Sequence, residues 1–99
     1  MNSTKSPELI IAMHHRSLPV GSTDLILERH ALVTGLSEST AVEITAIEDT
    51  IREASLSSFT GKVVALHTLR AQQRQTSRAL NVLAREIRKR EERGVPLSG

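Results

Sequence analysis

The chain has 99 residues, a formal net charge of +2, no cysteine and a single aromatic residue, Phe59. Without thiols it forms neither disulfides nor thiolate metal sites, and a cysteine nucleophile is excluded. The apolar stretch at residues 9–13 is shorter than the core of a signal peptide or a membrane span, so we expect a cytoplasmic protein.

Charge is distributed unevenly along the chain. Residues 1–50 carry three basic and seven acidic groups, whereas residues 51–99 carry ten basic and four acidic groups. Such asymmetry can attract an acidic partner to the second half. We favour the simpler interpretation that the two halves neutralise each other, within one chain or between antiparallel protomers.

The first predicted element is a short helix from Pro7 to about Arg16, within a single helical domain at residues 6–94. Ser6 is a candidate capping residue, Pro7 suits the first helical position, and Glu8 faces the positive end of the helix dipole. We expect residues 1–5 to be a disordered tail and residues 95–99 to be a flexible one. Residues 17–22 contain a proline and a glycine and predict a turn.

Two middle helices follow in the prediction. The first is capped by Ser22 or Thr23 and closed by Gly35 as a left-handed residue, with residues 37–39 as a link. Thr40 and Glu43 have the spacing of a capping box and predict the start of the second. Its apolar positions recur at helical steps and end before the serine-rich residues 55–58: Ile44, Ile47, Ile51 and Ala54.

The last predicted helix is the longest. Ser57 or Ser58 is its expected cap, the pattern continues without a break to Arg93, and Gly94 and Pro96 end it. At roughly 1.5 Å per residue it is about 50 Å long, around twice the length of either middle helix. Its apolar positions form two groups separated by the polar residues 70–78: Phe59, Val63, Leu66 and Leu69 in the first, and Leu80, Leu83 and Ile87 in the second.

These patterns predict an all-α protein, a small helical bundle or hairpin with a long C-terminal helix. The core depends on aliphatic side chains, which bury less area than aromatic ones. A thin core and an incompletely covered helix are often completed by a second copy of the chain. We therefore expect a homo-oligomer, with a dimer as the first expectation.

No catalytic or metal site is expected from the sequence, and no cofactor. The four histidines, His14, His15, His30 and His67, lack the i, i+4 spacing that chelates a metal, and no glycine-rich phosphate loop or serine nucleophile motif is present. The segment Ala65-Leu66-His67-Thr68-Leu69-Arg70 resembles the phospho-accepting helix of histidine phosphotransfer domains. That resemblance implies a phosphotransfer role at His67 as one alternative function.

The basic end of the last helix is the candidate for a second alternative, a DNA-binding accessory role. Arginines and lysines there could contact phosphates, although Glu86–Arg90 and Arg88–Glu92 are also spaced to form ion pairs. No aromatic residues interleave for base stacking, so the solvated, ion-paired helix is the favoured interpretation. The candidate nucleic-acid contacts are Arg85, Arg88, Lys89, Arg90 and Arg93.

Two short stretches resemble the TraM-type quorum-sensing antiactivators of alphaproteobacteria. They are Leu18-Pro19 followed, after extra residues, by Thr23-Asp24-Leu25, and Ala79-Leu80-Asn81-Val82-Leu83. The resemblance implies a helical dimer that sequesters a transcription factor. The segment at residues 47–69 resembles uncharacterised small helical proteins of alphaproteobacterial mobile elements, which imply no function.

We therefore expect a regulatory protein-binding module without enzymatic activity that acts by occlusion. The resemblance implies a transcription factor as the partner, with its dimerisation or DNA-binding surface blocked. The expected partner surface lies on the last helix and mixes basic with apolar side chains: Arg70, Arg74, Arg78, Leu80, Leu83 and Ile87.

Overall fold

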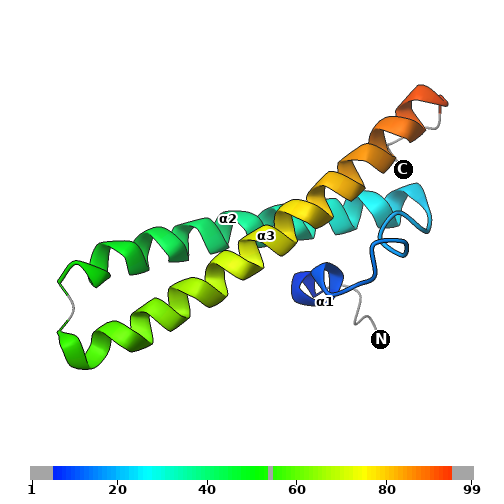
Figure 1. Cartoon of the computed structure of the whole chain (residues 1–99). Coiled ribbons are helices and arrows are strands. Elements are labelled where there is room, and N and C mark those ends of the chain that lie inside the picture. The colour runs from blue at the N-terminus through cyan, green and yellow to red at the C-terminus, as the bar shows by residue number, and fades with distance from the viewer. Residues whose placement is uncertain (1–5, 54, 95–99) are drawn as a thin grey trace.

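The protein is a long antiparallel helical hairpin with a short helix packed against one half of it (Figure 1). A computed structural model describes residues 6–53 and 55–94, with α1 at Pro7–Ile11, α2 at Thr23–Ile51 and α3 at Leu56–Glu92. The all-α prediction with a long, unbroken C-terminal helix is confirmed. The expected tails at residues 1–5 and 95–99, Ala54 and the stop at Pro96 lie outside the described residues.

Two predicted helix ends are confirmed, and two features of α1 differ from the prediction. Ser22 caps α2, since its hydroxyl accepts a hydrogen bond from the backbone N–H of Leu25 at 3.1 Å. Gly94 follows α3 with a φ of +78°, a left-handed conformation that glycine adopts without steric cost. α1 ends at Ile11, earlier than predicted, and turns occupy most of the chain up to α2. The hydroxyl of Ser6 bonds the Glu8 carboxylate instead of capping the backbone.

The predicted break around Gly35 is wrong, because α2 runs through it for 29 residues. One seam of buried positions continues in phase on both sides of the glycine, from Val33 through Leu36 to Thr40. A mid-helix glycine costs about 1 kcal/mol, less than two buried aliphatic side chains contribute.

The expected capping box is also wrong, since Thr40 is fully buried within the helix. The length of α2 also corrects the expectation that the last helix is twice as long as its neighbours.

α3 begins at Leu56, so the predicted caps Ser57 and Ser58 already lie in its first turn. Ser55 occupies the capping position, and its carbonyl accepts hydrogen bonds from the backbone N–H groups of Ser58 and Phe59 at 3.1 and 2.9 Å.

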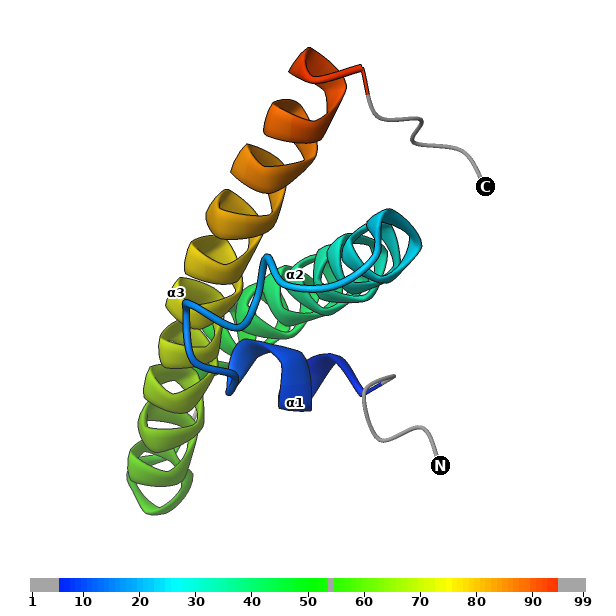
Figure 2. The same cartoon turned by 90° about the vertical axis from the view of Figure 1, so that its right-hand side faces the viewer.

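The hairpin has two halves that differ in how many layers they contain. We call the half that carries α1 the proximal half, with residues 23–39 of α2 and 73–92 of α3. The distal half contains residues 40–51 and 56–72, up to the connection between the two helices. α1 and the segment after it cross the proximal half (Figure 2), and there all three layers contribute to one buried cluster: Ile10, Leu18, Ile26, Val33, Ala79 and Leu83.

Two arginines fix the segment between α1 and α2. The guanidinium of Arg29, 6% exposed, donates to the carbonyls of Ser17, Leu18 and Val20 at 3.2, 2.7 and 2.9 Å. From α3, Arg90 donates to the carbonyls of residues 19 and 21 and to the Thr23 hydroxyl. These bonds supply donors to carbonyls that accept no hydrogen bond from a helix or sheet, and so hold the segment next to α1 in place.

Candidate protein-binding surface

The distal half exposes apolar side chains because only two helices form it. No described side chain of α3 between Ser57 and Gln75 is buried. Phe59 and Val63 remain 43% and 40% exposed, and Val64 is 60% exposed. Four more apolar side chains of the same half are partly buried: Ile47, Ile51, Leu66 and Leu69. We call these seven side chains the distal apolar strip. Apolar side chains that cluster on an exposed surface mark a site of protein contact.

A polar contact separates the closed core from this strip. The amide of Gln72 donates to the buried hydroxyl of Thr40 at 2.7 Å, which joins α3 to α2. One turn further along α3, the buried hydroxyl of Thr76 donates to the carbonyl of Gln73 at 2.8 Å. Gln72 and Thr76 both lie in the polar segment that interrupts the apolar pattern of α3. The hydrogen bond between Gln72 and Thr40 joins the two helices at this level and fixes their register.

The two long helices carry opposite charge. α2 contains six acidic residues and one basic residue, Arg29, whereas α3 contains eight basic and three acidic residues. Across the described residues only one ion pair joins these helices, between Arg70 and Glu48. A second pair, Glu86–Arg90 at 2.7 Å, lies within α3 as predicted, whereas the predicted pair Arg88–Glu92 does not form. Most charged side chains of these two helices therefore have no ion pair among the described residues.

The predicted partner-binding residues divide into two groups in the structure. Arg70, Arg74 and Arg78 are exposed on α3. Leu83 is fully buried, and Leu80 and Ile87 pack against the same core. The expectation that Leu83 forms part of the partner surface is wrong, because the three-layered core encloses it, whereas Leu80 and Ile87 keep part of their surface exposed. The apolar surface that remains free lies nearer the N-terminus of α3.

The predicted nucleic-acid contacts also divide. Arg85, Arg88, Lys89 and Arg93 are exposed near the end of α3. Arg90 is not available for phosphates, because Glu86 and the residues at 19–23 engage its whole guanidinium group. Its role in the fold corrects that expectation.

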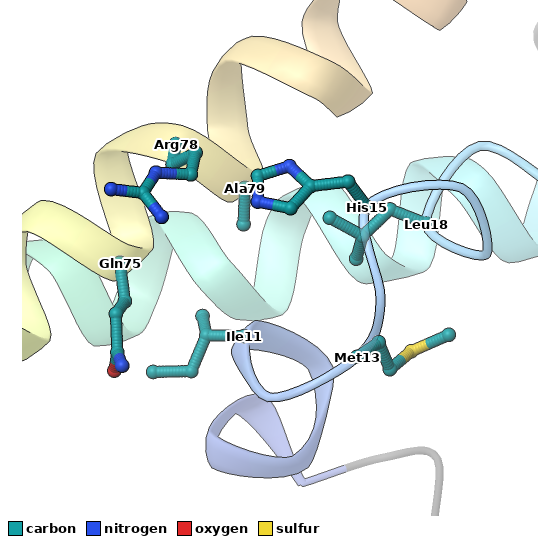
Figure 3. Close-up of a pocket in the computed structure, with 7 residues that line it drawn as sticks. All are labelled: Ile11, Met13, His15, Leu18, Gln75, Arg78 and Ala79. Carbon is teal, nitrogen blue, oxygen red and sulfur yellow. The ribbon is translucent and has the colours of Figure 1, made fainter.

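Features that could support catalysis are sparse in the described part of the chain. A pocket of about 90 Å³ lies between the segment after α1 and α3, with His15 and Arg78 on its wall (Figure 3). This pocket is smaller than ordinary cofactor sites, and larger hollows of about 480 and 580 Å³ lie elsewhere, with Arg74 on the wall of the first and Lys62 on that of the second. No group of three or more histidine and carboxylate side chains gathers within residues 6–53 and 55–94. His67 is exposed on the distal half of α3.

Two exposed apolar residues of the distal half were not predicted, Val64 on α3 and Val42 on α2, which is 69% exposed. Both lie off the predicted seams, so periodicity did not distinguish them from scattered surface residues. The clearer signal is the number of layers, because α1 and the segment after it cross the proximal half and leave residues 56–72 facing α2 (Figure 2).

Comparison with known proteins adds no family. No family model, curated protein or solved structure matches the chain. Among the described helices, none is long and apolar enough to cross a membrane.

Proposed function

We propose that this chain is a non-enzymatic regulatory protein that works by binding another polypeptide through its distal half. The observation that carries the proposal is the distal apolar strip, which lies on two helices and lacks the third layer present in the proximal half. Burial of apolar area contributes roughly 25 cal/mol per Å², so a helical surface laid over the strip would be stabilised.

The partner expected from this chemistry is itself helical and amphipathic. Two antiparallel helices leave a shallow groove between them, which suits another helix or hairpin. Arg74, just beyond the distal half on α3, is exposed and has no ion pair among the described residues, so it favours a carboxylate on the partner's flank. Regulation would follow by occlusion, since a bound partner surface is unavailable for its other contacts.

A narrower proposal is that the chain is an antiactivator that sequesters a transcription factor. It is supported by the resemblance to TraM-type antiactivators. The residues that carry this resemblance lie in the proximal half, where Leu18, Ala79 and Leu83 are buried and Thr23 accepts a hydrogen bond from Arg90. The resemblance therefore concerns the residues that build the fold, and the binding half has to be tested by itself.

Site-specific photo-crosslinking in cells tests the proposal. A benzophenone side chain replaces Val63 in the strip, and Ala84, exposed on the proximal half of the same helix, is the matched control. We expect protein adducts from position 63 and few or none from position 84. Absence of protein adducts at positions 59, 63 and 64, with the chain folded, would contradict a binding role for the distal half.

A further inference from the structure

Five basic side chains of α3 lie on one face of this helix, in the proximal half. We call them the basic face: Arg74, Arg78, Arg85, Arg88 and Lys89. At about 3.6 residues per turn, these positions fall within roughly 100° of one another around the helix axis. All five are exposed, and the buried side chains of α3 lie on the opposite side of the helix. The basic face therefore points away from the core, and it extends for about 22 Å at roughly 1.5 Å per residue.

The charges of the basic face are not balanced by neighbouring carboxylates. Glu86 is the one acidic residue of α3 between residues 74 and 89, and Arg90 forms an ion pair with it at 2.7 Å. No side chain of the basic face has an ion pair among the described residues, and Arg88 lacks the pair with Glu92 that its spacing predicts. Like charges three and four residues apart destabilise a helix, so an anion that spans the face would remove a repulsion.

Three hollows along α3 place neutral hydrogen-bonding groups among these arginines. Arg78 and Asn81 each line two of them, so the three hollows adjoin along the helix. Serine, glutamine and asparagine side chains line the largest, of about 480 Å³, and no acidic side chain lines any of the three. The hollow of about 580 Å³ in the distal half, by contrast, is lined by Asp49 and Glu53. Guanidinium, amide and hydroxyl donors are the groups that contact phosphate oxygens, so the chemistry of the basic face fits a row of phosphates.

The side chains between the charges select among polyanions. Ser77, Asn81 and Ala84 are exposed there, and no exposed large apolar side chain lies between residues 74 and 89. A membrane surface or a protein partner is held in large part through buried apolar area, which this face does not offer. It has no aromatic side chain on which unpaired bases would stack, which disfavours a single strand. The remaining polyanion is a nucleic-acid duplex, whose phosphates are accessible from outside.

We propose that the basic face binds the phosphate backbone of double-stranded DNA, independently of base sequence. Duplex DNA carries one negative charge per about 1.7 Å of its axis, so a face of roughly 22 Å lies beside on the order of a dozen charges. Figures 1 and 2 both show the C-terminal turns of α3 diverging from α2, which leaves that end of the helix open to a body as wide as a duplex. The basic face lies outside the distal apolar strip, so this inference does not rest on the proposed function.

This set of contacts differs from the one expected from the sequence. Arg90 leaves the set, because Glu86 and the segment before α2 engage it. Arg74 and Arg78 enter it, because the face continues toward the middle of α3. The sequence pattern favoured an ion-paired helix, but only one of the two predicted pairs forms.

Fluorescence anisotropy with a labelled DNA duplex of mixed sequence, about two helical turns long, tests the proposal. The face variant carries Arg78→Gln, Arg85→Gln and Arg88→Gln. Its matched control removes as many positive charges elsewhere, with Arg16→Gln, Arg52→Gln and Lys62→Gln. We expect the face variant to bind at least about tenfold more weakly than the wild type, and the control to change by less than about threefold.

The salt dependence of binding counts the phosphates in contact. The logarithm of Kd should rise with the logarithm of salt concentration by about 0.9 for each phosphate contacted, so the face variant should lose about 2.7 of the wild-type slope. No binding to the duplex at about 50 mM salt, or equal losses in the two variants, overturns the proposal. So does tighter binding, at equal charge, to a single strand of the same sequence, to polyglutamate or to phosphatidylserine vesicles, since the duplex would then be the wrong occupant.

A measurement on the unaltered chain covers the case of variants that do not fold. On addition of the duplex, backbone amide shifts in NMR spectra should concentrate in residues 74–89 and spare the distal half. Shifts concentrated in the distal half would overturn the assignment to the basic face. Photo-crosslinks at position 63 test the proposed function by themselves, so either proposal can fail while the other stands.

Discussion

The proximal and distal halves of the hairpin are built from the same two helices but have different interiors. In the proximal half, α1 and the segment after it supply Ile10 and Leu18, and Leu83 becomes fully buried. In the distal half, equally apolar residues such as Phe59 and Val63 stay near 40% exposed. The difference lies in the number of layers. Five helical residues and a turn are enough to close one half, and the other half remains open for a partner.

The largest expected effect is a loss of stability when a side chain of the proximal core is truncated. Leu83→Ala should lower the free energy of unfolding by about 3 kcal/mol, because it leaves a cavity among packed side chains. Phe59→Ala, in the distal half, should cost less than about 1 kcal/mol in the isolated chain. Urea unfolding of both variants, at a concentration too low for self-association, measures the contrast. Equal losses would show that Phe59 is as well covered as Leu83, and that the halves do not differ.

A smaller effect is expected from the arginine that holds the segment next to α1 in place. Arg29→Met removes the donor shared by three carbonyls, and we expect a loss of about 2 kcal/mol. The loss is limited because Nε of Arg29 has no hydrogen-bond partner among the described residues, so the wild type already carries one unsatisfied group.

Hydrogen exchange resolves where this change acts. The amides of Met13 and Leu18, bonded to carbonyls at residues 10 and 14, should exchange faster, while amides in the distal half of α2 keep their wild-type rates. Arg29→Lys keeps the charge but not the forked set of donors, so its amide exchange rates should lie between those of the wild type and those of Arg29→Met. Uniform acceleration along both long helices would mean that Arg29 supports the whole hairpin and not the proximal half alone.

The next prediction concerns the hydrogen bond between Thr40 and Gln72, at the boundary between the proximal and distal halves. Thr40→Val keeps the shape of a fully buried side chain but removes the acceptor of Gln72, so we expect a loss of about 1 kcal/mol. The same change with Gln72→Leu should recover part of it, since neither polar group then lacks a partner. A double variant no more stable than the single one would show that the hydrogen bond does not define the boundary.

Sequence patterns predicted the class of fold and the extent of α3, because helix periodicity and the stop at Gly94 are local properties. They failed where tertiary packing decides. A buried arginine and a buried threonine, Arg29 and Thr40, look like surface residues in a single sequence. Whether Leu83 faces a partner or the chain's own α1 depends on where a five-residue helix docks. Periodicity predicted four residues of the distal apolar strip as an apolar group of the last helix. It does not report that these residues stay exposed, because exposure depends on the third layer, which only the proximal half has.

The smallest expected effect tests whether α2 is continuous through Gly35, where the sequence predicted a break. Gly35 has an ordinary helical backbone, is exposed, and has nothing within 4 Å of an added Cβ atom. Gly35→Ala should therefore raise the free energy of unfolding by about 0.5–1 kcal/mol, because alanine loses less backbone entropy on entering a helix. If Gly35 instead closed a shorter helix in a left-handed conformation, the same change would strain the backbone and destabilise the protein. The sign of the shift in thermal unfolding separates these two structures. Gly94→Ala, at a glycine whose φ is +78°, is the matched control and should be destabilising or neutral.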